Sequence, residues 1–197
     1  GVPALDWPSP LRLRVDRYVR EPFDPYRDWT EVTAVMQPWR GVFSEAMILD
    51  RDEWIGRLRD ELGIGAIIFI PPTGDIEPNY PMHVYQEAVQ DYHAAGLRVL
   101  MYWSIMHIGH HDLWHQVTKN HPDWAQRDIG GNPITRYGDL WLCPNTDALD
   151  FSINIGCDLL REMDADGIML DNNSFGIAPD GPTGYCNGCE EAFADWV

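Results

Sequence analysis

The stretch DADGIMLDNNSFG, residues 164–176, decides the fold class of this chain. Its apolar run, residues 168–170, is typical of a short buried strand, and Asp166 is expected at the turn that begins it. The strand ends on Asp171, Asn172 and Asn173. In parallel α/β folds, whether closed barrels or open sheets, chemistry takes place at the carboxyl ends of the strands. Asp171 therefore lies where such a fold places its catalytic groups.

The rest of the chain repeats this strand pattern, with helices between the strands. Strands are expected at 33–39, 65–72 and 97–105, and the second is a continuous apolar run stopped by two prolines, as in strands buried on both faces. Helices are expected at 50–63, 81–96 and 146–164, and residues 184–197 are expected to form a turn that opens another helix. The alternation predicts a parallel α/β sheet with right-handed crossovers. A closed barrel and an open sheet both fit this pattern.

Two of these helices have a clear inward face. Asp50 is the expected N-cap of helix 50–63, with Trp54, Ile55, Leu58 and Leu62 along its apolar side. The expected inward stripe of helix 81–96 consists of Val84, Tyr85, Ala88, Val89 and Tyr92.

Composition excludes several classes of partner. The 197 residues suffice for one domain with a sizeable core. The net charge of -17 argues against nucleic acid, and no apolar run approaches the ~20 residues of a membrane span, so no membrane partner is expected. The first residues show no secretory signal pattern. We expect a soluble, acidic protein whose compartment stays open, with the cytoplasm slightly favoured over secretion.

The domain organisation has one long interruption. Residues 1–30 are expected to form an N-terminal arm and residues 31–197 a single α/β domain with a long insertion at 106–146 after the third strand. Segments of this length inside a compact domain are usually functional. The insertion is rich in histidine, and His107, His111 and His115 would share one face of a helix, as metal ligands do. Gly109 interrupts that helix pattern, so a metal-dependent hydrolase using this loop is a secondary hypothesis.

Four segments then carry a resemblance to a known family. They are HAAGLRVLMYWSI (93–105), HPDWAQRDIGGNP (121–133), LCPNTDALDFSINIGCDLLREMDADGIMLDN (142–172) and GYCNGCEEAF (184–193). Together they resemble the glycoside-hydrolase-like barrel family, whose relatives include α-L-fucosidases, α-galactosidases and zinc-carrying β-galactosidases. The resemblance covers residues 45–197.

This resemblance implies a (β/α)8 TIM-type barrel of which the chain holds only about the first four β/α units, since a full barrel needs about 250 residues. It implies a carbohydrate substrate and a glycoside hydrolase, expected to be retaining, with Asp171 in the position of the nucleophile. Asn172 and Asn173 stand where another group of barrel glycosidases has an Asn-Glu pair, which favours that assignment. The general acid would come from a later strand, so we expect completion by further chain or by oligomerisation. The alternative is a carbohydrate-binding or catalytically inactive barrel fragment.

Several other residues are candidates for contact with a sugar, each with a structural alternative such as a turn cap or a place in the core. Asparagine side chains offer N–H donors, and aromatic rings stack on the apolar faces of sugars. The predicted substrate-binding residues are Trp39, Asp75, Trp103, His107, Asn172 and Asn173.

The cysteines suggest a structural metal. The zinc-carrying relatives use a Cys-x-Cys-x-x-Cys cluster and one earlier cysteine, and here Gly184 stands at the first position of the cluster. Cys143, Cys186 and Cys189 are left as three candidate ligands of a structural zinc ion, one short of the usual four. A disulfide, either Cys186–Cys189 or a longer-range pair, and free thiols are the alternatives, and Cys157 is expected in the core. No cofactor is required for the expected reaction.

Overall fold

The structure is a computed structural model that describes residues 33–38, 42–72, 80–107, 119–136, 139–173, 175 and 183–197. Within them, a parallel sheet is formed by β1 (Ala34–Met36), β2 (Ala66–Phe69), β3 (Arg98–Ser104) and β6 (Gly167–Asp171). The strands lie in the order β1-β2-β3-β6, which is also their order along the chain. The predicted parallel α/β sheet and its four strands are confirmed. A sheet without a reversal of strand order is wound like a barrel and not like a doubly wound open sheet.

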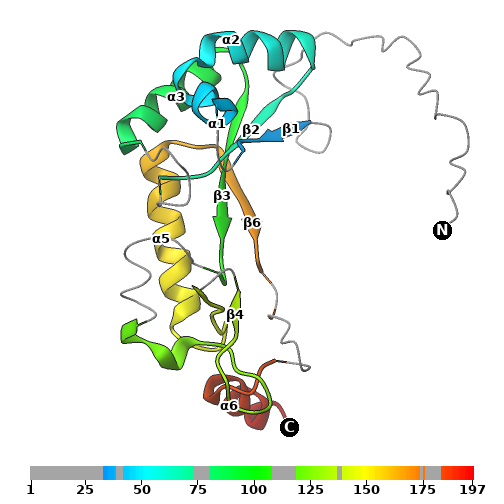
Figure 1. Ribbon diagram of the computed structural model, residues 1–197, viewed down its shortest axis with the longest axis vertical. Coiled ribbons are helices and arrows are strands. Elements are labelled where there is room, and N and C mark those ends of the chain that lie inside the picture. The colour runs from blue at the N-terminus through cyan, green and yellow to red at the C-terminus, as the bar shows by residue number, and fades with distance from the viewer. Residues whose placement is uncertain are drawn as a thin grey trace, which may run out of the picture.

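The helices between the strands cover one face of this sheet. They are α1 (Val42–Leu49), α2 (Arg51–Ile55), α3 (Met82–Ala94) and α5 (Ala148–Met163). Three contacts establish the common face: Gln37 donates to Ser44 of α1, Phe69 packs edge-on against Tyr92 of α3, and Trp103 donates to Ser152 of α5. Figure 1 shows α5 running alongside β3 and β6.

The expected helix 50–63 differs from the structure in two ways. An additional helix, α1, precedes it, and Asp50 lies between α1 and α2 without making a side-chain cap hydrogen bond. The helix continues through a π-helical turn, Gly56–Glu61, that turns Leu62 out of line with Leu58. Leu58 is buried as predicted, whereas the prediction for Leu62 is wrong because its side chain is 59% exposed.

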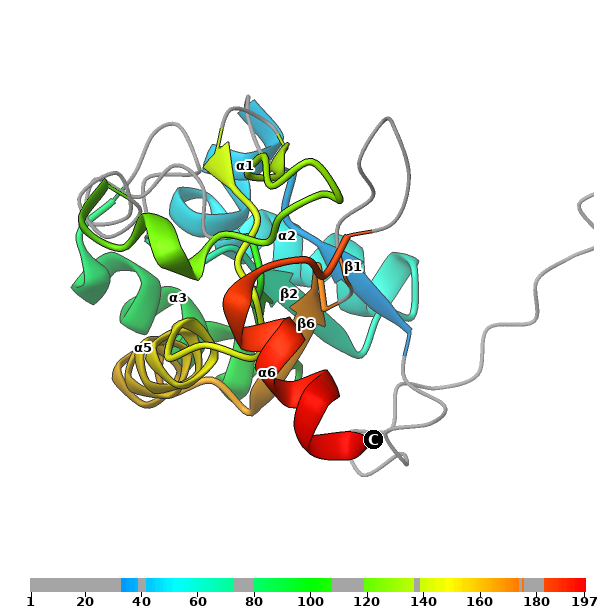
Figure 2. The same cartoon turned by 90° about the horizontal axis from the view of Figure 1, so that it is seen from below.

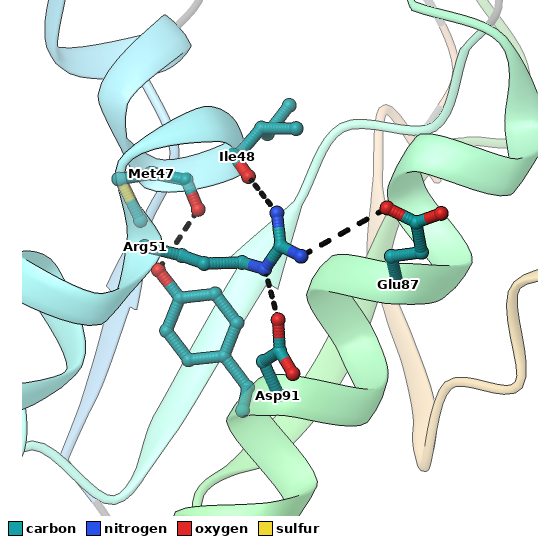
Figure 3. A network of polar contacts seen from close by, with 6 residues as sticks. Met47, Ile48, Arg51, Glu87 and Asp91 are labelled. Atoms are coloured by element: carbon teal, nitrogen blue, oxygen red, sulfur yellow. Dashed lines mark hydrogen bonds and ion pairs between the residues drawn. The ribbon is translucent and has the colours of Figure 1, made fainter.

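The expected helix 81–96 is confirmed as α3, whose Tyr85, Ala88, Val89 and Tyr92 are buried. An arginine holds α1 and α2 onto it. Arg51 donates to Asp91 and to the carbonyl oxygen of Ile48, and forms a longer ion pair with Glu87 (Figure 3). These contacts join the first two helices to α3.

The described part of the predicted insertion lies beyond the carboxyl ends of the strands. It contains a 3₁₀ turn, Pro122–Trp124, and a short antiparallel pair of β4 (Thr135–Arg136) and β5 (Asp139–Leu140). The last helix, α6 (Asn187–Trp196), lies at the same end (Figures 1 and 2). Residues 1–30, the expected N-terminal arm, lie outside the described residues. Among the described helices, none is both long and apolar enough to cross a bilayer.

Candidate functional site

Asp171 is the last residue of β6, and its side chain is exposed at the carboxyl end of the sheet. Each carboxylate oxygen accepts one hydrogen bond: the Tyr102 hydroxyl donates to Oδ2 over 2.8 Å, and the backbone N–H of Asn172 donates to Oδ1 over 2.7 Å. Two donors on different oxygens fix the plane of the carboxylate.

Asn172 supports this arrangement from the strand end. Its φ of 53° is in the left-handed region, which asparagine adopts more readily than most residues. Its side-chain amide donates to the Ser104 hydroxyl over 2.6 Å, and Ser104 lies opposite Asp171 in the β3–β6 register. Asn173 is exposed. Sequence reasoning missed Tyr102 and Ser104, although their i, i+2 spacing on β3 places both on the face that carries Asp171.

The prediction that Trp103 is a stacking platform for a sugar is wrong. Trp103 points to the helix-covered face, where its indole N–H donates to Ser152 over 3.3 Å. Its ring lies directly against Gly156 of α5 and is only 5% exposed. Adjacent residues of a strand face opposite sides of a sheet, so Tyr102 and Trp103 cannot both face the ligand side. Trp103 is a core residue between sheet and helix.

The remaining predicted sugar contacts are less well placed by the structure. His107 pairs with Trp141 in an isolated bridge, its ring lies 5.4 Å from that indole, and the residue is 7% exposed. Its contact with a sugar stays a prediction. Trp39 and Asp75 lie outside the described residues, as do His111 and His115 of the metal hypothesis for the insertion.

The structure brings the three predicted metal ligands together. Cys143 follows the bridged residues Trp141 and Leu142, while Cys186 is the N-cap of α6 and Cys189 lies in its first turn. The Cys143 sulfur lies 3.0 Å from that of Cys186 and 3.3 Å from that of Cys189. All three sulfurs lie within 4.8 Å of one another, and no other such cluster occurs among the described residues. Cys157 is elsewhere, half-buried on α5.

The cluster suits a thiophilic ion in its donor set and spacing. All its cysteines are free thiols. Tetrahedral zinc with bonds of about 2.3 Å would separate its sulfurs by about 3.8 Å, whereas the Cys143 sulfur lies 3.0 Å and 3.3 Å from the other two. Burial raises the pKa of the Cys143 and Cys189 thiols. Thiols in such surroundings stay protonated at neutral pH, and a bound divalent cation would displace their protons.

Gly184 lies next to this cluster. A side chain built on it would place its Cβ 3.9 Å from the Cys189 sulfur. The first position of the expected Cys-x-Cys-x-x-Cys cluster, occupied here by Gly184, therefore lies beside Cys189. The φ of 104° at Gly184 favours glycine. The cluster therefore consists of the three cysteines predicted from the sequence.

Comparison with solved structures shows which proteins share this fold. A maltogenic α-amylase from Thermotoga neapolitana matches 75% of this chain at a TM-score of 0.54 and 21% identity. An α-galactosidase from Lactobacillus brevis matches 70% of the chain at a TM-score of 0.51 and 15% identity. The chain shares its fold with glycoside-hydrolase (β/α)8 barrels. No protein-family model matches the chain, and no curated protein matches it.

The chain spans only part of these barrels: 39% of the amylase and 20% of the galactosidase. A protein from Ruminiclostridium thermocellum, described only as hypothetical, differs in this respect. It matches 84% of this chain over 90% of its own length, at a TM-score of 0.51 and 12% identity. At these identities the likeness concerns the fold alone.

Proposed function

We propose that this chain provides the first half of a glycoside-hydrolase barrel and that Asp171 is the nucleophile of a retaining reaction. The observation that carries the proposal is the placement of Asp171, an exposed carboxylate at the carboxyl end of β6 with both oxygens hydrogen-bonded. Barrel enzymes place their catalytic residues at this end of the strands. The substrate would be a glycoside, and Asn172 and Asn173 would lie beside the sugar.

In a retaining reaction Asp171 would attack the anomeric carbon and expel the leaving group, forming a covalent glycosyl-enzyme that water then hydrolyses. A second carboxyl group about 5 Å away would protonate the leaving group and later activate the water. We propose that this group belongs to later strands of the barrel. Substrates whose leaving group needs no proton therefore test Asp171 separately from its partner.

The test uses 2-deoxy-2-fluoroglycosyl fluorides of several sugars in both anomeric forms, with the intact mass of the chain as readout. Fluoride departs without a general acid, and the 2-fluoro group slows hydrolysis of the intermediate. We expect the mass to increase by one fluorosugar on the peptide containing Asp171. Asp171→Asn should abolish labelling, whereas Asp158→Asn, on the exposed surface of α5, should leave it unchanged.

Labelling of any other carboxylate would overturn the nucleophile assignment. Binding of a sugar by the unmodified chain, measured by calorimetry, with no labelling from any fluoride, would favour the carbohydrate-binding alternative. In that case Asp171→Asn should leave affinity largely unchanged, because a neutral amide of the same shape still contacts the sugar.

We infer also that further strands complete the sheet, supplied by additional chain or by association. The proposal is supported by the short span of the solved barrels that this chain matches and by half-buried apolar side chains of Ile68, Leu100 and Met169 on the face opposite the helices. Native mass in solution tests association. A monomer of the 22.6 kDa chain would leave additional chain as the route to completion.

A structural zinc ion at Cys143, Cys186 and Cys189 is a separate proposal, supported by the spacing of their sulfurs. The ion would hold the first turn of α6 against the segment that follows Leu142. It would supply no step of the glycosidase reaction.

A further inference from the structure

Asn145 lies between the cysteine cluster and the first turn of α6. Its backbone N–H is 3.4 Å from the Cys143 sulfur, and its side-chain Nδ2 is 3.3 Å from the Cys189 sulfur. One residue therefore offers an N–H donor to each of two sulfurs that come from different segments of the chain.

The backbone around Asn145 is held from both sides. The Thr146 hydroxyl donates to the Cys143 carbonyl oxygen over 2.8 Å and accepts from the Ala148 N–H, which ties the turn to the start of α5. On the other side, Gly188 approaches so closely that a Cβ built on it would lie 2.2 Å from the Asn145 carbonyl oxygen. Asn145 therefore has little freedom to turn away from the sulfurs.

This position matters because α6 has few other attachments in the described structure. None of its residues from Asn187 to Trp196 is buried, and Phe193 and Trp196 are 62% and 81% exposed. Its buried neighbour is Cys186, the N-cap, which is 1% exposed. Contacts at the first turn, and not an apolar helix face, thus fix the helix.

Three thiolates around a divalent cation carry a net charge of -1 that buried surroundings disfavour. N–H donors to the sulfurs spread this charge, and outer contacts of this type typically change metal affinity by about 10–100-fold. Two donors on one residue, each directed to a different sulfur, also limit the distance between those sulfurs.

We propose that Asn145 is a positioning residue for a divalent metal ion at this cluster, donating its side-chain N–H to Cys189 and its backbone N–H to Cys143, so that occupancy by the ion docks α6. The inference rests on the proposed metal site and is independent of the proposed glycosidase reaction. The rival role for Asn145 is that of a fourth ligand, with its amide turned so that Oδ1 faces the ion.

The test is titration of the reduced chain with Co²⁺, followed by sulfur-to-cobalt charge-transfer absorption and by competition with Zn²⁺. We expect Asn145→Ala to weaken affinity by about tenfold or more, because Cys189 loses its donor. Asn145→Asp should weaken it at least as much, since a carboxylate repels the thiolate. Asn187 lines one surface pocket together with Asn145 and serves as a control. Asn187→Ala and Cys157→Ser, on α5, should both leave affinity unchanged.

The outcomes separate the hypotheses. Asn145→Asp binding as tightly as the unmodified chain, or more tightly, would identify Asn145 as a ligand and overturn the positioning role. Unchanged affinity of Asn145→Ala would overturn both roles, because the side chain would then contribute nothing to binding. Failure of the unmodified chain to bind either ion would remove the metal site itself while leaving the reaction at Asp171 untouched.

Hydrogen exchange provides a second readout that does not depend on affinity. Zn²⁺ should slow amide exchange in residues 186–197 of the unmodified chain and do so less in Asn145→Ala measured at saturating Zn²⁺. Equal protection in both proteins would contradict the link between Asn145 and docking. Circular dichroism of the metal-free proteins checks that the variant folds.

Discussion

The two faces of the central sheet differ in how completely they are covered. On the helix-covered face, Ile67, Phe69, Val99 and Met101 are all fully buried. On the opposite face, Ile68 and Leu100 of the same two strands are only half-buried. The helix layer is therefore complete over this part of the sheet, while the other face retains exposed apolar area that additional structure would bury. The candidate nucleophile lies on that second face.

The largest expected effect comes from truncating neighbouring isoleucines that face opposite ways. Ile67→Ala removes a fully buried side chain between β2 and the helices and should cost about 2–5 kcal/mol of unfolding free energy. Ile68→Ala removes the same atoms from the half-buried face and should cost about 1–2 kcal/mol. Urea unfolding of both variants measures the difference.

Equal losses of unfolding free energy would contradict the difference between the two faces, because they would mean that the second face is already packed. The same pair of variants can be measured in a longer chain that carries further strands. There, Ile68→Ala should become as costly as Ile67→Ala if those strands cover this face.

Adding a methyl group to each face should give a smaller difference. Gly156→Ala on α5 would bring a Cβ within 2.9–3.1 Å of three atoms of the Trp103 ring, and should cost about 1–3 kcal/mol. Gly167→Ala on the opposite face meets only the end of the Leu100 side chain at 3.0 Å. That side chain can move, so the change should be near neutral. Thermal unfolding compares the two, and a more harmful Gly167→Ala would contradict the looser packing of this face.

A smaller loss of stability than for Gly156→Ala is expected at Tyr102, which lies on the face opposite the helices and is 6% exposed. Tyr102→Phe keeps the ring and removes the hydroxyl that donates to Asp171, at a cost of about 0.5–1.5 kcal/mol. The same variant should slow fluorosugar labelling of Asp171, and the increase in the activation free energy of labelling should exceed the loss of unfolding free energy. Unchanged labelling would show that the backbone donor of Asn172 suffices to orient the carboxylate.

Most of the fold was predictable because its signals are local. Runs such as 66–70 are apolar without alternation, and α3 carries a regular inward stripe, so each element follows from a short window of sequence. The additional helix α1 was missed because its sequence, VFSEAMIL, is apolar on nearly every side and offers no clear period. The exposure of Leu62 depends on a π-helical turn, and no pattern in the sequence predicts that turn.

The candidate site was predictable only in part, because it depends on contacts between segments. Asp171 follows from its place at a strand end, and the approach of Cys143 to Cys186 and Cys189 was expected only from the resemblance stated for the sequence. Tyr102 and Ser104 required the register between β3 and β6, which pairs residues 67 positions apart. Trp103 was assigned to the wrong face because a buried strand with apolar residues on both sides does not reveal its orientation.

The sequential order of the strands also bears on how the chain is made. Each of β2, β3 and β6 pairs with the strand that precedes it in the sheet, so the sheet can grow at one edge as the polypeptide leaves the ribosome. Closing the loop between β3 and β6 carries the largest entropy cost of these steps, because it spans the insertion and α5. The edge that receives β6, and with it Asp171, should be the last part of this sheet to become protected during synthesis.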